Sequence, residues 1–287
     1  MERRLPAVPN GFGSVFELTP GTNNTWTEKV LYSFDPGSGG ILPYRGVVRD
    51  PAGNLYGTTA QGGAYFNGTV FELVAGSNGS WTEKTLYSFT GVNDGADPET
   101  LLILDAAGNL YGTTTYAGPN DYGSVFELKR GGNGDWTLKT IYAFTGVSGL
   151  NPFSGLTFDS AGNLYGTSET TAFELMPGPN GKWTEKTLHA FTGGTDGAGA
   201  YSGLIFDKEG DLYGTTSLGG LHEGTVYELK PAAGSWTEKV LHRFAGGSGD
   251  GSYPLLPNLL RDASGNLYGT TPEGGSSGAG VVYEITP

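Results

Sequence analysis

Short segments in which apolar and polar residues alternate recur along the whole chain, separated by turns rich in Gly, Asn and Asp. The most regular is Trp-Thr-Glu-Lys-Val-Leu-Tyr-Ser-Phe at residues 26–34, and four similar runs follow it. A period of two predicts a β-strand in which every second side chain, from Trp26 to Phe34, lies on one face. A second recurring segment, Val-Phe-Glu-Leu at residues 70–73, predicts another strand. Its Glu and the Lys of the first segment are expected to form a solvated cross-strand pair without chemical function.

A ten-residue run, Asp-Pro-Ala-Gly-Asn-Leu-Tyr-Gly-Thr-Thr at residues 50–59, predicts a hairpin and has four near-copies further along the chain. The side chain of Asp50 can accept hydrogen bonds from nearby backbone amides, and Gly53 can adopt the left-handed conformation that closes a short loop. The turn therefore explains the five recurring Asp residues without catalysis. Gly57 lies inside the following strand, where a glycine indicates a bulge or the close approach of another backbone.

Each repeat of about 50 residues contains four strand-like segments, which is typical of a β-propeller blade. We therefore predict an all-β fold: a five-bladed β-propeller of four-stranded blades, closed by pairing of the N- and C-terminal segments. The whole chain, residues 1–287, is predicted to be one domain. Its repeat units are expected at about 46–89, 101–144, 155–191, 203–244, and 257–285 completed by 15–34.

The Val-Phe-Glu-Leu segment, which is the third strand of each predicted blade, occurs six times and the other three segments five times, so one terminal copy is spare. We expect Val282–Ile285 to pair in the last blade, with Trp26–Phe34 as its fourth strand and Val15–Leu18 as the displaced competitor. The pattern alone leaves open which terminus supplies the third strand. It also leaves open whether the chain is a fragment of a longer repeat protein.

Composition narrows the classes of partner. The chain has 287 residues, 51 of them Gly, and a formal net charge of −13. This charge argues against nucleic acid and anionic membranes as partners. The absence of Cys excludes disulfides and thiol chemistry. No apolar run is long enough to span a bilayer. We expect a monomer without membrane insertion.

The string Asp-x-x-Gly-Asn-Leu-Tyr-Gly-Thr-Thr, followed by Gly-Gly and Gly-Thr-Val-Phe-Glu-Leu, resembles the GloVer tandem repeat of bacterial choice-of-anchor proteins. The resemblance covers roughly residues 11 to 287. It implies a β-propeller-like bacterial protein that is secreted or held at the cell surface, and it brings no established catalytic residue. The chain departs from the family pattern in showing neither a leader nor a C-terminal anchoring segment.

Loops on one side of the predicted propeller vary most, and variable loops on a constant scaffold commonly carry function. Just before the first, innermost strand of each predicted blade, the equivalent positions of the five repeats form a ring of aromatic residues with one acid. Such a ring at the mouth of the central channel suits sugar stacking or a small apolar ligand. Alternatively, these side chains plug the channel. The candidate ligand-binding residues are Tyr44, Glu99, Phe153 and Tyr201, with the fifth aligned position near Leu256, and His222 and Glu223 in a variable loop.

Two groups of polar residues in the variable loops could carry acid–base chemistry or bind a metal ion. His222 beside Glu223 suits acid–base work or a solvated loop pair. Asp94, Asp97 and Glu99 could together form a calcium site, although ordinary turn chemistry also explains them. No cofactor is otherwise expected. His189 and His242 take positions that Tyr holds elsewhere, so we interpret them as packed aromatic residues. The loop Glu169–Thr171 is shorter than its equivalents, which is either a harmless deletion or the opening of a groove.

Three functions fit these observations. The preferred hypothesis is a non-catalytic propeller that binds a glycan or a cell-surface ligand through its variable loops. The second is a polysaccharide-active enzyme resembling a glycoside hydrolase, in which Glu99 acts with Asp97, Asp196 or Glu223. The third is a purely architectural repeat protein. The sequence does not identify the ligand, and it leaves open whether any catalysis occurs.

Overall fold

The computed structural model describes residues 11–37, 39–220, 223–255 and 258–286. The chain forms two compact units, Met1–Ala143 and Phe144–Pro287. Across the described ranges the regular structure is β-strand, apart from one 3₁₀ turn at Pro179–Gly181. No helix in the part of the chain that is described is long and apolar enough to cross a membrane.

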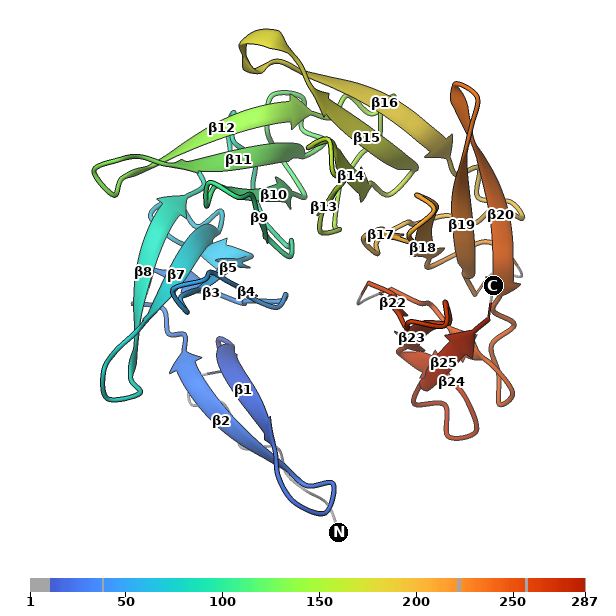
Figure 1. Cartoon of the computed structure of the whole chain (residues 1–287), viewed down its shortest axis with the longest axis horizontal. Coiled ribbons are helices and arrows are strands. Elements are labelled where there is room, and N and C mark those ends of the chain that lie inside the picture. The colour runs from blue at the N-terminus through green and yellow to red at the C-terminus, as the bar shows by residue number, and fades with distance from the viewer. Residues whose placement is uncertain (1–10, 38, 221–222, 256–257, 287) are drawn as a thin grey trace. The chain divides into compact units, whose positions relative to one another are not determined.

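The first unit contains two complete four-stranded antiparallel sheets (Figure 1). Their strands are β4 (Val48–Arg49), β5 (Leu55–Thr59), β7 (Thr69–Ala75) and β8 (Trp81–Ser88), then β9 (Ile103–Leu104), β10 (Leu110–Thr114), β11 (Ser124–Arg130) and β12 (Trp136–Ala143). Ahead of them, β1 (Ser14–Pro20) pairs with β2 (Trp26–Ser33) as a separate ribbon. A short pair, β3 (Gly40–Ile41) and β6 (Gln61–Gly62), joins the loops beside the first sheet.

The second unit also contains two complete sheets, followed by a three-stranded one. The complete sheets are β13 (Thr157–Phe158), β14 (Leu164–Thr167), β15 (Thr171–Pro177) and β16 (Trp183–Ala190), then β17 (Ile205–Phe206), β18 (Leu212–Thr216), β19 (Thr225–Ala232) and β20 (Ser235–Arg243). The last sheet has β22 (Leu260–Arg261), β23 (Leu267–Thr271) and β25 (Val281–Ile285), and β21 (Gly251–Ser252) pairs with β24 (Glu273–Gly274) beside it. The chain has the all-β, five-bladed β-propeller fold that the repeats predict.

The two ends of the chain differ in how their strands pair. β25 pairs with β23 as the third strand of the last sheet, as we expected for Val282–Ile285. Val15–Leu18 lies in β1, which pairs with β2 in a separate sheet and takes no place in the last sheet. Completion of the last sheet by Trp26–Phe34 stays a prediction, and so does the single domain.

A β-bulge in each long hairpin decides where the aromatic side chains pack. Val70 faces Tyr87 and Phe71 faces Thr85, so the intervening Leu86 has no partner and the alternation of the strand reverses there. The same bulge in the first ribbon leaves Trp26 exposed, while Tyr32 and Phe34 pack in the core. The prediction that Trp26 and Phe34 share one face is therefore wrong.

Because of the bulge, each hydrophobic cluster lies between two consecutive sheets. In one cluster Val70 and Phe89 from the first sheet pack with Phe126 and Leu128 from the second. Phe71 and Trp81 point the other way and pack with Val15 and Phe34 of the ribbon. Phe rings from consecutive sheets meet edge to face in these clusters; the ring centroids of Phe89 and Phe126, for example, lie 5.3 Å apart.

Gly57 provides room for an aromatic side chain. The pairing of β5 with β7 has no bulge at this point, so that part of the prediction is wrong. A Cβ atom on Gly57 would lie 2.6 Å from Cζ of Phe71. The close approach is thus made by a ring of the neighbouring strand and not by another backbone. Gly112, Gly166, Gly214 and Gly269 face the equivalent ring in the same way.

Candidate binding site

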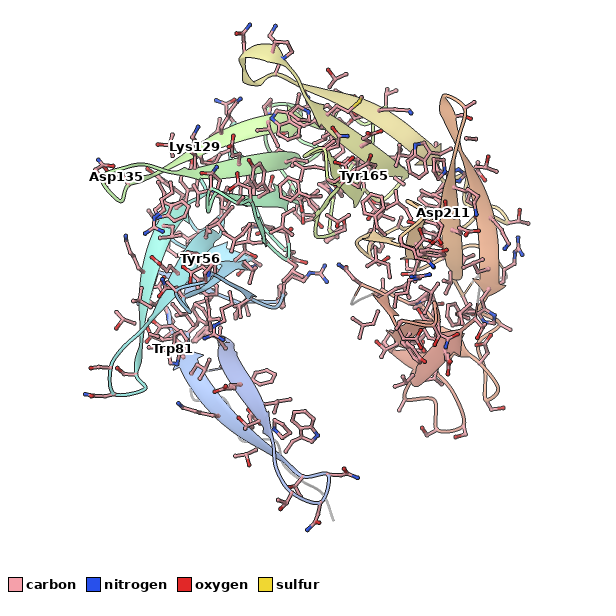
Figure 2. The ribbon with its side chains drawn as sticks, in the orientation of Figure 1. Tyr56, Trp81, Lys129, Asp135, Tyr165 and Asp211 are labelled. Carbon is pink, nitrogen blue, oxygen red and sulfur yellow. The ribbon has the colours of Figure 1, made fainter. Side chains whose placement is uncertain are left out.

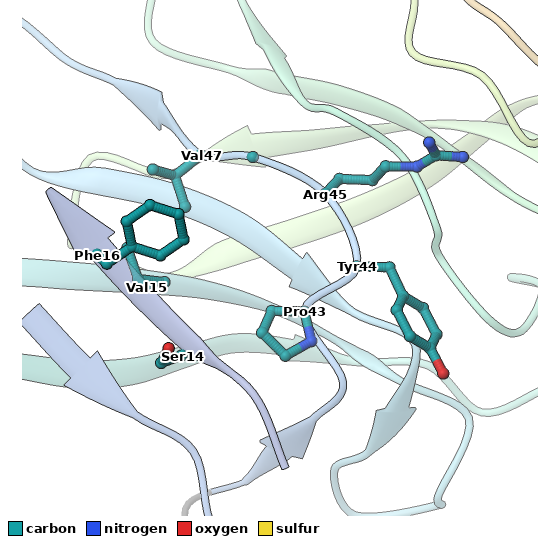
Figure 3. A pocket seen from close by; sticks show the side chains of 8 residues that line it. Ser14, Val15, Phe16, Pro43, Tyr44, Arg45 and Val47 are labelled. Atoms are coloured by element: carbon teal, nitrogen blue, oxygen red, sulfur yellow. The ribbon is translucent and has the colours of Figure 1, made fainter. Parts of the chain in front are cut away.

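A pocket of about 410 Å³ in the first unit contains one of the predicted ligand-binding residues, Tyr44 (Figure 3). Its walls come from the start of β1 and from the segment between β3 and β4. Tyr44 is 59 % exposed and Phe16 is 54 % exposed, so both rings are available to a ligand. The lining residues are Ser14, Val15, Phe16, Pro43, Tyr44, Arg45, Gly46 and Val47.

Arg45 connects this pocket to the next loop. Its Nε donates a hydrogen bond to the backbone oxygen of Glu99 at 3.0 Å. Burial lowers the pKa of Arg45, and the charge of Glu99 acts against that shift. The guanidinium is therefore held between the Tyr44 segment and the acidic loop, where it adds a fixed positive charge to the site.

Glu99 and Asp97 are two half-buried acids on that loop. Burial raises the pKa of Asp97. Burial also raises the pKa of Glu99; Arg45 lowers it and the nearby Asp97 raises it further. Asp97 adopts a positive φ of 51° and its backbone oxygen accepts a hydrogen bond from the amide of Glu99 at 2.8 Å. The loop thus presents two acids whose protonated forms are favoured more than in water.

Phe153 and Tyr201 lie together in the second unit. Their rings meet edge to face with centroids 5.0 Å apart, and both side chains are half-buried. Of the predicted residues, the structure thus brings Phe153 and Tyr201 together in the second unit. This ring contact favours packing as the role of Phe153 and Tyr201. In the first unit it is Arg45, next to Tyr44, that contacts the Glu99 loop.

The remaining candidates in the second unit give a mixed result. His222 and Leu256 lie outside the described residues. The backbone oxygen of Glu223 accepts a hydrogen bond from the amide of Tyr253 at 2.9 Å, which ties its loop to the next one. His189 packs edge to face on Phe191 and lies 3.3 Å from Asp196, and His242 has equivalent contacts with Phe244 and Asp250, consistent with our interpretation of packed aromatic residues.

Asp94 is taken up by the turn that contains it. Its carboxylate accepts hydrogen bonds from the amide and the hydroxyl of Thr90 and from the hydroxyl of Tyr87. Burial raises the pKa of Asp94, but these hydrogen bonds outweigh it and the pKa is lowered overall. Within the described ranges, no group of three or more His, Cys, Asp or Glu side chains is arranged to hold a metal ion. The calcium site at Asp94, Asp97 and Glu99 stays a prediction.

A Tyr bridged between two acids recurs in the repeats and was missed at the level of the sequence. The hydroxyl of Tyr56 donates to Oε1 of Glu72 at 2.8 Å and lies 3.1 Å from Oδ2 of Asp50. Glu72 is only 7 % exposed, so it is not the solvated ladder charge that we expected. Figure 2 shows Tyr56 and its counterpart Tyr165 within their sheets. The signal was present in the sequence, because the Asp, Tyr and Glu recur together in every repeat.

Two exposed aromatic residues, Tyr65 and Phe66, were also missed. They lie between β6 and β7, are 58 % and 81 % exposed, and belong to the same unit as Tyr44. In equivalent turns of other repeats the position of Phe66 is taken by Asp121 and Gly278. In all three turns the amide of this residue donates to the backbone oxygen of the glycine three positions before it. The sequence signal that could have identified Phe66 was therefore a Phe at a position where other repeats have Asp or Gly.

The fold and the site define the chain as a repeat β-propeller with a ligand-sized pocket among its loops. The sequence model of the Gloeobacter/Verrucomicrobia repeat matches residues 7–173 and 168–287. The chain therefore belongs to this repeat family, which confirms the resemblance found in its motifs. The comparison with curated proteins gave no match.

Solved structures show the same fold at low sequence identity. A protein of unknown function from Dyadobacter fermentans has a TM-score of 0.53 at 13 % identity, over 99 % of this chain and 86 % of that one. Virginiamycin B lyase from Staphylococcus aureus has a TM-score of 0.53 at 12 % identity, over 96 % and 75 %. A gluconolactonase from Xanthomonas campestris has a TM-score of 0.51 at 14 % identity, over 95 % and 78 %. At these identities the similarity concerns the fold alone.

Proposed function

We propose that this protein is a non-catalytic propeller that binds a glycan through the pocket at Tyr44. The observation that carries the proposal is an exposed Tyr ring at a pocket of about 410 Å³, beside an Arg held in place by the next loop. An aromatic face packs against the C–H face of a sugar ring, and Arg and carboxylate groups hydrogen-bond its hydroxyls. The volume lies within the usual range of ligand pockets. A cell-surface or secreted bacterial protein would meet such ligands.

Affinity electrophoresis in gels that contain neutral polysaccharides tests this function. We expect at least one of mixed-linkage glucan, galactomannan and xylan to retard the protein. Tyr44→Ala should weaken binding about tenfold, while Tyr44→Phe, which keeps the ring, should retain it. Val147→Ala, at a 93 % exposed position in the second unit, is the control for an exposed apolar side chain. Retardation that is equal for the wild type and Tyr44→Ala would refute the role of the pocket.

A polysaccharide-active enzyme is the second candidate, favoured by one observation. Burial raises the pKa of both Asp97 and Glu99 next to Arg45, and a glycosidase needs one carboxylic acid with a raised pKa as its general acid. Release of reducing ends from a bound polysaccharide, abolished by Glu99→Gln, would establish this function in place of binding alone. If the protein neither binds nor cleaves any of the three polysaccharides, both candidates are refuted for neutral polysaccharides, and the third hypothesis, a purely architectural repeat protein, gains support.

A further inference from the structure

The loops of the first unit expose several aromatic rings, and those described in the second unit do not. The exposed aromatic residues on loops of the first unit are Tyr44, Tyr65, Phe66, Tyr116 and Tyr122. On the described loops of the second unit, the exposed large apolar side chains are aliphatic: Val147, Leu218 and Leu255. Exposed aromatic side chains in the loops of one unit, with their absence from the described loops of the other, favour the first unit as the one that binds a ligand.

Phe66 is held in a backbone conformation that does not suit it. Its φ is +62°, in the left-handed region, where a bulky residue is an outlier. Asp121 and Gly278, at the same turn position of other repeats, have φ of +64° and +70°, and both residue types tolerate this region. Folding alone would favour Gly or Asp at this position. A strained Phe that is also the most exposed aromatic side chain among the described residues therefore points to a role outside the core.

The loop that carries Tyr65 and Phe66 is fixed to both loops of the Tyr44 site. On one side, the amide of Gly63 donates to the backbone oxygen of Gly39, next to the short pair of β3 with β6. On the other side, Asn67 accepts from the amide of Asp97 at 3.1 Å and donates through Nδ2 to the oxygen of Thr90 at 2.9 Å. The rings are therefore presented on a preorganised surface, which reduces the entropy lost on binding.

We propose that Tyr65 and Phe66 form a second stacking subsite, so that the first unit binds an extended, neutral polysaccharide across more than one sugar. This inference rests on the proposed glycan binding at Tyr44. Two separate aromatic platforms suit a polymer of repeated sugar rings better than a single small molecule. The net charge of −13 and the acids Asp97 and Glu99 disfavour an acidic polysaccharide. They equally disfavour an anionic lipid surface.

The test compares chain lengths. For the neutral polysaccharide that retards the protein most, its oligosaccharides of two and of eight sugars are titrated by calorimetry. We expect the wild type to bind the longer one at least tenfold more tightly, and Phe66→Gly and Tyr65→Ala to bind both lengths about equally. Tyr65→Phe should keep the preference. Asp121→Gly is the matched control, because it changes the same turn position in the next repeat.

Thermal unfolding supplies a second readout. Phe66→Gly removes an unfavourable φ, so its melting temperature should equal or exceed that of the wild type while long-chain binding falls. This combination excludes misfolding as the cause of lost binding.

The outcomes separate the two proposals. If Tyr44→Ala abolishes binding of both lengths while Phe66→Gly keeps the length preference, the second subsite is refuted and the pocket stands. If Phe66→Gly weakens polysaccharide binding and Tyr44→Ala does not, the pocket is refuted and the Tyr65–Phe66 surface stands. Failure to bind any of the neutral polysaccharides, or stronger binding to polygalacturonate or to neutral lipid vesicles, overturns the inference.

Discussion

Replacing Tyr56 by Phe tests whether the buried Asp–Tyr–Glu bridge stabilises the repeats. The change removes one hydroxyl, which donates at 2.8 Å to Glu72 and lies 3.1 Å from Asp50. Tyr56 is almost completely buried and Glu72 is 7 % exposed, so water cannot readily replace the lost donor. A hydrogen bond to a charged group contributes about 1.5–3 kcal/mol, and we expect the free energy of unfolding to fall by about 2 kcal/mol.

Tyr268 provides the internal control for this prediction. It makes the same two contacts, to Glu284 at 3.1 Å and to Asp262 at 3.2 Å, but Glu284 is exposed. Water can solvate that carboxylate, so Tyr268→Phe should cost clearly less than Tyr56→Phe. Urea denaturation monitored by Trp fluorescence measures the free energy of unfolding of the wild type and of both variants. Equal losses of stability from the two substitutions would refute burial of the Glu as the source of the effect.

Two further substitutions test the packing and the electrostatics of the repeats. Gly57→Ala places a Cβ atom 2.6 Å from the ring of Phe71, so urea denaturation should show a loss of roughly 1–3 kcal/mol; Gly132→Ala, which has open space around it, is the control, and equal losses would contradict the steric explanation. Asp94→Asn should destabilise the protein at pH 7 by about 1–2 kcal/mol, because a neutral amide is a weaker acceptor for the amide and hydroxyl of Thr90 than the charged carboxylate it replaces. Since the folded-state pKa of Asp94 is lowered, its contribution is present above the unfolded pKa of about 3.9 and disappears as the pH falls through the folded-state value. The stability difference between wild type and variant should therefore narrow below about pH 4, and a difference that is unchanged from pH 7 to pH 3 would contradict this account.

The sequence predicted the strands and the turns well because both depend on local patterns. The Asp50 turn forms as expected: the amide of Asn54 donates to its Oδ1 at 2.9 Å, and Gly53 has a φ of +97°. The periodicity of the fourth strand identified the strand but not its faces. A single unpaired residue such as Leu86 reverses the alternation, and its position depends on pairing with another strand.

The candidate site was predictable only in part. Tyr44 was identified from its place in a variable loop, but the pocket also needs Phe16 from β1, and no local pattern shows that these two segments meet. The buried state of Glu72 was missed for a related reason. Glu72 lies opposite Lys84 on the neighbouring strand, which suggests a solvated ion pair. In the structure Glu72 is instead buried, and it accepts a hydrogen bond from the hydroxyl of Tyr56. Phe66 was overlooked because its unusual φ is evident only from the backbone, although its replacement of Asp and Gly in the repeats could have identified it.

The bulge in the long hairpins also bears on how such a protein lengthens in evolution. Because it sends the two ends of one strand to opposite faces, each repeat brings half of one hydrophobic cluster and half of the next, as Trp81 and Phe89 do. Tandem duplication of a whole repeat therefore copies two matching halves and needs no new packing arrangement at the joint. Loss of part of a repeat leaves unlike surfaces facing one another. Selection on this scaffold should accordingly add or remove entire repeats, while the loops between them diverge.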